Sequence, residues 1–430
     1  MDLRTGFAYW LLRNGLLATY SPLDRDETAD VTIVGGGITG ALAAYELSHA
    51  GANVVVVDKR DVASGSSTAT TGLLLCETDT SLLELSERVG EHAAARVYHL
   101  GREAISRIES LTTSLADSCG FARRSSLYLA STSADARMLE REYALRRAHG
   151  LGVALLDAGE IHRKWGIDAP AAIYSHGGEI DCYRFAHRLL EGAAKRGARI
   201  YARTPVDRLD IEDGERMTVV TAGPHRIHTR WVVAATGYEA VEQMRPPQTE
   251  LSSTWVVASE PLSGGTPWAE RSLIWETARP YIYARTTDDN RIIVGGEDEP
   301  YAEGHQDRDL LKRKTARLSS RLNALFPQLR LEVAYAWAGT FGSTVDGLPL
   351  IGPSPGNPRL WFALGYGGNG ITFSVIAARL LVDAYLGRQS PDAPTFALDR
   401  RSVPDAARGP AVSRRLDAAP LATGLRSPSP

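Results

Sequence analysis

The sequence predicts an α/β protein in which a Rossmann-like domain carries an inserted α+β domain roofed by an antiparallel sheet. Three observations support this prediction. A βαβ pattern with a glycine-rich turn lies near the N-terminus, strands that look antiparallel and long helical stretches fill the middle, and a second glycine cluster opens a helix near the C-terminus. The 430 residues are enough for two domains.

Residues 31–58 contain the βαβ pattern. An apolar run leads into a glycine-rich turn, a helix-like segment follows, and a second apolar run ends on Asp58. Gly35 permits a tight turn, Gly37 lets the backbone approach a pyrophosphate, and Gly40 lets the helix pack closely on the strand. An acid at the position of Asp58 can accept hydrogen bonds from a ribose. Because these features occur in this order, the segment predicts a dinucleotide site.

Composition excludes several other classes of protein. A hydrophobic content of 43%, a charged content of 23% and a net charge of −3 give no reason to expect nucleic acid or an anionic membrane as a partner. Cys76, Cys119 and Cys182 lie far apart, and the histidines form no ligand pattern, so we expect no disulfide scaffold and no metal site. The apolar patch at 7–12 is too short for a membrane span and lacks a cleavage site. We therefore expect a soluble, cytoplasmic protein.

The remaining elements follow from hydrophobic periodicity. Residues 1–29 form an arm rich in large apolar side chains, which we expect to pack on the body or to cover a site. Helical spacing is found over 79–118, 134–149, 181–196, 307–326 and 371–386. Strand patterns are found over 127–131, 153–156, 198–202, 217–222, 226–235, 255–258, 281–284, 291–296 and 360–363, and the pair 217–222 and 226–235 is expected to form a hairpin. Residues 401–430 lack periodicity and predict a disordered tail.

The organisation points to a flavin rather than a nicotinamide. A protein that binds only a nicotinamide dinucleotide would usually follow its first unit with further βαβ units and a parallel sheet. Here the glycine cluster at 365–370 offers a second helix start far along the chain. A long, bent flavin dinucleotide held by both ends of the sequence fits this arrangement better.

Four blocks of sequence resemble the D-amino-acid oxidase-like family of FAD-dependent oxidoreductases, which includes glycine and sarcosine oxidases. The blocks are 31–58, the Ser/Thr-Gly stretch at 64–73, the strand end at 234–237, and 346–371. The resemblance implies a doubly wound FAD domain made of segments 30–100, 157–248 and 336–400. It also implies a substrate domain, made of 101–156 and 249–335, whose antiparallel sheet covers the substrate face of the flavin.

The resemblance carries over to individual residues. The pyrophosphate loop, the ribose acceptor and its neighbours would be Gly35, Gly37, Ile38, Thr39, Gly40, Asp58, Lys59 and Arg60. The stretch around the pyrophosphate and the flavin, together with the adenine half, would use Ser66, Ser67, Thr68, Gly72, Leu73, Val206, Thr236 and Gly237. The late strand and the helix start facing the flavin pyrimidine would add Gly342, Gly367, Gly368, Asn369, Gly370 and Ile371. A solvated polar loop at 64–72 and a glycine turn that caps a buried helix at 365–370 remain alternative interpretations.

Departures from the family pattern concern the substrate. The stretch 339–346 contains no arginine to bind a substrate carboxylate, so Arg279 or Arg285 would have to reach the site from the roof sheet. Tyr281, Arg285 and Tyr366 are the substrate-side candidates. No lysine lies between Lys195 and Lys312, where sarcosine oxidases use one for oxygen activation. Neither a histidine in the Ser-Ser stretch nor a cysteine near the late strand is present for covalent attachment, so FAD is expected to bind noncovalently.

The resemblance implies oxidation of the CH–NH bond of an amine or amino acid. Hydride would pass to flavin N5, the imine product would be hydrolysed by water, and O2 or another acceptor would take the electrons. Three alternatives stay open: a dehydrogenase that passes electrons to a quinone or a carrier, an enzyme acting on a CH–OH substrate, and a flavin-binding subunit without turnover.

Overall fold

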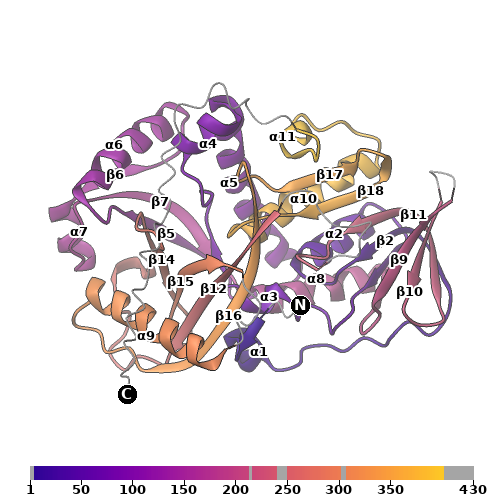
Figure 1. Cartoon of the computed structure of the whole chain (residues 1–430), viewed down its shortest axis with the longest axis horizontal. Coiled ribbons are helices and arrows are strands. Elements are labelled where there is room, and N and C mark those ends of the chain that lie inside the picture. Colours follow the sequence, from indigo (N-terminus) through magenta and orange to yellow (C-terminus); the bar gives the residue numbers. More distant parts are fainter. Residues whose placement is uncertain (1–3, 213–215, 240–248, 302–306, 401–430) are drawn as a thin grey trace, which may run out of the picture.

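The computed structural model describes residues 4–212, 216–239, 249–301 and 307–400. These residues form two mixed sheets, one on each side of Figure 1, with helices α1 (Tyr9–Asn14) and α3 (Ser66–Ala69) between them. The prediction of an α/β protein with a Rossmann-like part and an antiparallel roof is confirmed. The predicted tail at 401–430 lies outside the described residues.

The smaller sheet, here called the core sheet, has eight strands within the described residues. In spatial order they are β17 (Leu350–Ser354), β18 (Asn357–Leu364), β11 (Arg226–Ala234), β2 (Glu27–Val34), β3 (Val54–Val57) and β8 (Arg199–Tyr201). In addition, β10 (Met217–Thr221) pairs with β11, and β9 (Val206–Ile211) pairs with β10. The run from β18 to β8 is parallel, and the predicted hairpin between β10 and β11 is confirmed. Parallel strands of this kind are buried on both faces, which explains the unbroken valine run of β3.

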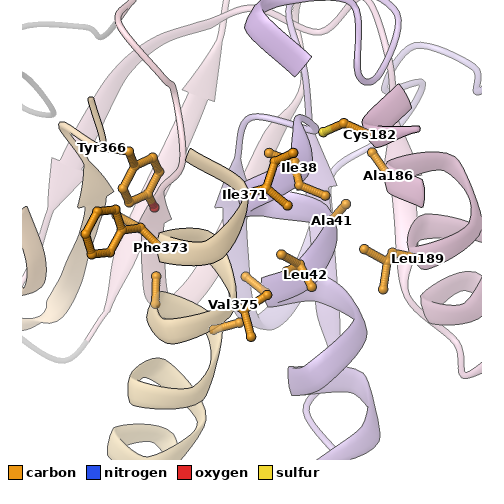
Figure 2. Packing of buried hydrophobic residues seen from close by; sticks show 14 of the residues in the cluster. Ile38, Ala41, Leu42, Cys182, Ala186, Leu189, Tyr366, Ile371, Phe373 and Val375 are labelled. Carbon is orange, nitrogen blue, oxygen red and sulfur yellow. The ribbon is translucent and has the colours of Figure 1, made fainter. Parts of the chain in front are cut away.

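Helices cover one face of the core sheet. They are α2 (Ile38–His49), α8 (Cys182–Lys195), α10 (Gly370–Tyr385) and α5 (Glu91–Ser114). Figure 2 shows α2 between α10 and α8, with Ala41 and Leu42 lying among side chains of these two helices such as Val375 and Leu189. On the opposite face, the apolar side chains of the parallel strands pack against those of β9 and β10. This packing fixes the starts of α2 and α10 side by side.

The larger sheet, here called the roof sheet, has ten strands within the described residues. In spatial order they are β1 (Arg4–Gly6), β16 (Val333–Thr344), β12 (Thr249–Ser259), β15 (Ile292–Pro300), β14 (Ile282–Thr286), β13 (Leu273–Glu276), β5 (Ala122–Leu129), β7 (Ala171–Glu179) and β4 (Leu73–Leu74), with β6 (Ala154–Asp157) paired to β7. Neighbours are antiparallel except β13 and β5. The remaining elements are α4 (Leu82–Val89), α6 (Ser133–Ala148), α7 (Ala158–Trp165), α9 (Arg308–Leu325), α11 (Ala393–Phe396) and the 3-10 helix η2 (Ala269–Arg271). Helix α9 packs on β12 and β15.

Strand β7 was not predicted because its sequence carries little strand signal. It contains Gly177 and Gly178, and a Cβ at Gly177 would lie 2.4 Å from the Leu74 carbonyl oxygen. The close approach of β4 therefore explains why glycine, a residue with poor strand propensity, occupies position 177. Both β7 and β16 belong to the roof sheet, although they fall in ranges assigned by resemblance to the FAD domain.

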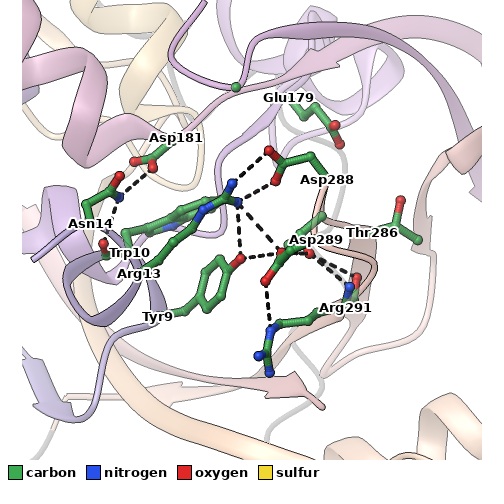
Figure 3. Close-up of polar contacts among 12 residues, drawn as sticks. Tyr9, Trp10, Arg13, Asn14, Glu179, Asp181, Thr286, Asp288, Asp289 and Arg291 are labelled. Carbon is green, nitrogen blue, oxygen red and sulfur yellow. Dashed lines mark hydrogen bonds and ion pairs between the residues drawn. The ribbon is translucent and has the colours of Figure 1, made fainter. Parts of the chain in front are cut away.

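The N-terminal arm packs across the boundary between the two halves (Figure 3). Strand β1 extends the roof sheet by pairing with β16, and Tyr9 and Trp10 are buried. The Trp10 indole donates to the Thr70 carbonyl (2.6 Å), whereas the Tyr9 hydroxyl donates to Asp289 (2.5 Å). The arm thus connects the Ser/Thr stretch with the turn between β14 and β15. No helix within the described ranges is long and apolar enough to cross a membrane.

Candidate cofactor and substrate site

One cavity of about 960 Å³ extends along the interface between the core sheet and the roof sheet. Its walls come from the first glycine turn, the Ser/Thr stretch, the end of β11, the roof strands and the start of α10. Ligand pockets commonly have volumes of about 300–1,000 Å³, so this cavity is at the large end of the range. It brings together segments that are more than 300 residues apart in the sequence.

The first glycine turn is held by contacts that a side chain would prevent. Gly35 has a φ of +110°, and a Cβ there would lie 2.2 Å from the Ala235 carbonyl oxygen. A Cβ at Gly40 would lie 1.8 Å from the Gly35 carbonyl oxygen. Gly37 caps the start of α2 with no side-chain hydrogen bond, and the Ile38 N–H donates to the Ser67 hydroxyl (2.9 Å). This is the geometry expected for a helix start that faces a phosphate.

The end of β3 forms the second part of this site. One Asp58 carboxylate oxygen accepts from the Gly36 N–H (2.7 Å) and the other from the Arg60 N–H (2.8 Å). Burial raises the pKa of the Asp58 carboxyl above its ordinary value. Lys59 and Arg60 both form ion pairs with Glu239 (3.0 and 2.7 Å). Because Glu239 offsets their charge, this end of the cavity suits ribose hydroxyls better than an additional phosphate.

The Ser/Thr stretch and the end of β11 line the middle of the cavity. Ser66, Ser67, Thr236 and Gly237 contribute to its wall, and the buried Thr236 hydroxyl has no hydrogen-bond partner in the described parts of the chain. The Thr68 side chain is fully buried and bonds the Gly65 carbonyl (2.9 Å). The orphaned Thr236 hydroxyl is an available partner for a bound polar group.

The second glycine cluster forms the far wall. Residues 367–371 line the cavity at the start of α10. The Gly368 N–H donates to Asp79 (2.6 Å) and the Asn369 side chain donates to the Glu77 carbonyl (2.7 Å). Helix α10 is tied to α2 by a hydrogen bond between the Thr39 and Ser374 hydroxyls (2.8 Å). Asp79 and Glu77 were not predicted, because they precede α4 in a segment without a motif.

The roof strands close the cavity with aromatic side chains. Tyr281 and Tyr283 lie with ring centroids 5.8 Å apart, and the Arg279 guanidinium lies 5.0 Å from the Tyr281 ring centroid. Trp275 and Tyr238 also line the cavity, and burial raises the pKa of Tyr238 to about 12. Sequence reasoning missed these two, together with Tyr283.

An acid lies next to the aromatic wall. Burial raises the pKa of Asp298 to about 6; hydrogen bonds from Thr254 and Tyr281 oppose the rise, and repulsion from Asp79 adds to it. One Asp298 carboxylate oxygen is buried and has no hydrogen-bond partner among the described residues. Burial likewise raises the pKa of the Tyr281 hydroxyl. This end of the cavity can therefore both accept hydrogen bonds and shape an apolar substrate.

The structure does not bring Arg285 to the cavity. Its side chain is buried, forms an ion pair with Glu179 (3.3 Å), and donates to the backbone carbonyl of Gly72 (3.0 Å). Arg285 lies on the same face of β14 as Tyr283, but two residues further along the strand, where its guanidinium donates to the carbonyls of Thr71 and Gly72 instead of reaching the cavity. Arg285 holds the Ser/Thr stretch from behind.

Four further predicted residues are near the cavity without lining it, and each has a structural reason. They are Gly40, Thr68, Gly72 and Gly342. A Cβ at Gly72 would lie 2.1 Å from the Ile180 carbonyl oxygen, and one at Gly342 would lie 2.8 Å from the Tyr238 ring. The other predicted residues line the cavity, Leu73, Val206, Tyr281 and Tyr366 included.

The described residues contain no group of three or more potential metal ligands. The Cys182 thiol borders the cavity at the start of α8, and burial raises its pKa, so the thiolate is disfavoured. The donor set therefore consists of backbone N–H groups, hydroxyls and one ribose-side acid. These groups fit an extended dinucleotide such as FAD, with the phosphates at Gly35–Ile38 and the ring system near α10 and the roof.

Comparison with known proteins agrees with this geometry. A family model named DAO and described as FAD dependent oxidoreductase matches residues 30–384. Glycine oxidase of Geobacillus kaustophilus is 27% identical over 86% of this chain and 97% of its own length. Gamma-glutamylputrescine oxidoreductase of Escherichia coli is 26% identical over 88% of this chain and 89% of its own. The crystal structure of the Geobacillus kaustophilus glycine oxidase superimposes with a TM-score of 0.75 at 23% identity, covering 87% of this chain and 99% of that one.

Proposed function

The chain belongs to the DAO family of FAD-dependent oxidoreductases, and from this premise we propose that it oxidises the CH–NH bond of an amine or amino acid. The product is an imine that water hydrolyses. Relatives named as a glycine oxidase and as a gamma-glutamylputrescine oxidoreductase support an amino-group substrate. Bound FAD supplies the hydride acceptor, and it is held noncovalently.

The observation that carries the proposal is the continuity of the cavity. The same space runs from the phosphate-binding turn at Gly35 to the start of α10 and then to the aromatic wall at Tyr281. A small substrate at that wall lies beside the part of the cavity that fits the flavin ring. The residues need only position its C–H bond, exclude water and stabilise developing charge.

Individual residues have distinct roles in this proposal. Arg279 binds the carboxylate of an amino-acid substrate, because it is the cavity-lining cation of the roof and its guanidinium lies beside the Tyr281 ring of the aromatic wall. Tyr281 and Tyr283 form the wall against which the substrate packs. The N–H groups at 369–371 and the positive end of α10 stabilise negative charge on the flavin pyrimidine.

The electron acceptor is O2 or another oxidant. Within the described residues, Lys59 is the only lysine that lines the cavity, and it lies at the ribose end. Lys314, on the helix α9 that packs on β12 and β15, is buried and pairs with Glu299 (2.6 Å). The roof therefore offers no ammonium to activate oxygen, which favours the second candidate function, a dehydrogenase that passes electrons to a quinone or a carrier protein.

The test is anaerobic mixing of the purified yellow protein with matched amines, amino acids and hydroxy acids. We expect an amine or amino acid to bleach the flavin absorbance at about 450 nm. Recolouring on admission of air identifies an oxidase, whereas persistent bleaching that a quinone reverses identifies a dehydrogenase. Bleaching by hydroxy acids alone, or by no compound, contradicts the proposal. A protein that purifies without any flavin contradicts it as well.

A further inference from the structure

Asp79 lies against the start of α10, the helix whose positive end faces the cavity. Its carboxylate accepts a hydrogen bond from the Gly368 N–H at 2.6 Å. A Cβ at Gly367 would lie 2.8 Å from one carboxylate oxygen, and a Cβ at Gly368 would lie 2.6 Å from the other. Both glycines are therefore required for this contact. The adjacent Glu77 carbonyl, which accepts from Asn369, fixes the loop that carries Asp79.

The Asp79 charge is not neutralised by an ion pair within the described part of the chain. The positive charge of Arg279 lowers the pKa of Asp79, but the hydrogen bond from Gly368 lowers it more. The surface that Asp79 exposes lines the cavity, while the protein packed around the carboxyl raises its pKa overall. A ligand that fills the cavity therefore meets this carboxylate directly.

This placement has an electrostatic consequence. The unpaired N–H groups at a helix start act as a partial positive charge of about half an elementary charge. A carboxylate at the same place offsets that charge, and in a site with little water the effect extends over several ångströms. Reduction of a flavin adds negative charge to its pyrimidine side, which lies next to α10 in the proposed arrangement.

We propose that Asp79 is a positioning residue that holds the Gly367–Gly368 turn and lowers the reduction potential of the bound FAD. It places a negative charge where the helix alone would favour the reduced cofactor. The proposal requires FAD binding but no particular substrate. It implies that electrons leave this protein for an acceptor more readily than they would without the carboxylate.

The test uses the FAD-loaded full chain and a probe that needs no turnover. Sulfite adds to oxidised flavin and leaves negative charge on the pyrimidine side, so its affinity reports the local charge. We expect Asp79→Asn to tighten sulfite binding at least tenfold and to shift the two-electron reduction potential, measured against reference dyes, to a more positive value. A tenfold change in the reduction equilibrium corresponds to about 30 mV for two electrons.

Two control variants separate charge from shape. Asp79→Glu keeps the charge and is expected to keep the sulfite affinity within a factor of about three. Asp24→Asn removes an exposed charge that is not part of the cavity lining and is expected to change neither readout. Equal sulfite affinity in wild type and Asp79→Asn overturns the proposal. Loss of FAD by Asp79→Asn also overturns it, because the residue then only holds the loop. Absence of FAD from the wild-type protein would instead contradict the proposed function.

Discussion

The two ends of the cavity are built in different ways. At the glycine-turn end, where we propose that the phosphates bind, the available groups are backbone N–H groups, and the sequence requirement is that Gly35 and Gly40 have no side chain. At the roof end, the working groups are side chains such as Arg279 and Tyr281, which reach the same space from separate segments. A backbone site leaves a local motif in the sequence. A side-chain site depends on which residues the fold brings together.

The largest expected effect tests the backbone end. Gly40→Ala places a Cβ 1.8 Å from the Gly35 carbonyl oxygen, and neither backbone can move away without separating α2 from β2. We expect loss of FAD from the purified protein and a large drop in the melting temperature. Gly152→Ala is the matched control, because a Cβ there meets nothing within 4 Å. Normal FAD content in Gly40→Ala would mean that this end tolerates side chains and that the contrast is false.

The next effect tests the side-chain end. Arg279→Gln removes the roof cation without changing the glycine turn, so FAD content should be unchanged. For carboxylate-bearing substrates we expect kcat/KM to fall about 10- to 100-fold, the usual cost of losing a charge-assisted contact. Amines that lack a carboxylate should be little affected. Arg388→Gln, an exposed arginine outside the cavity lining, is the control. An equal loss for both substrate classes would remove Arg279 from carboxylate recognition.

A pH-dependent effect sharpens the contrast, because the buried carboxyl of Asp298 at the roof end has a raised pKa. The folded pKa of Asp298, about 6, exceeds its ordinary value, so the folded state binds more protons than the unfolded state between about pH 4 and 6. Its contribution to stability is therefore lost as the pH rises through about 6. Asp298→Asn should gain unfolding free energy relative to wild type over that interval, by at most about 3 kcal/mol. Urea denaturation at pH 4.5 and pH 7 measures the change, and a constant difference would contradict it.

The smallest effect concerns the connection between the two ends. Trp10→Phe keeps an aromatic ring but removes the donor to the Thr70 carbonyl. We expect unfolding free energy to fall by about 1 kcal/mol and FAD to dissociate faster. Phe7→Leu, at an exposed position of the same arm, serves as the control. If FAD dissociation is unchanged while stability falls, the arm supports the roof sheet alone.

The contrast also explains how much could be predicted. Gly35, Asp58 and the cluster at 367–371, which line one cavity, could be predicted as candidates because glycine turns and strand ends leave a short-range pattern in the sequence. Arg285 was placed on the substrate side because its strand lies in the roof, but at its point along β14 the Gly72 carbonyl and Glu179 lie next to it and hold its guanidinium. Which segment covers a given point of a strand depends on contacts between distant parts of the chain, which the sequence of that strand does not determine.

Residues outside any motif were the hardest to find. Asp79 and Glu239 lie in the cavity only because loops after β4 and β11 bend toward it. Because the sequence of β7 has a weak strand signal, this strand of the roof sheet was not predicted. The positions of these two acids and the pairing of β7 depend on contacts between distant parts of the chain, which leave no pattern in the local sequence.

The pairing of β1 with β16 has a consequence for the order of events during synthesis. The arm is made more than 300 residues before its partner strand β16 is completed at Thr344. Trp10 can therefore close over Thr70 in its final place only late in translation, when the roof sheet is nearly whole. Contacts between such distant parts of a chain form slowly. We therefore expect the nascent protein to acquire its cofactor in one of the last steps of folding, when the arm with β1 and Trp10 packs on the roof sheet.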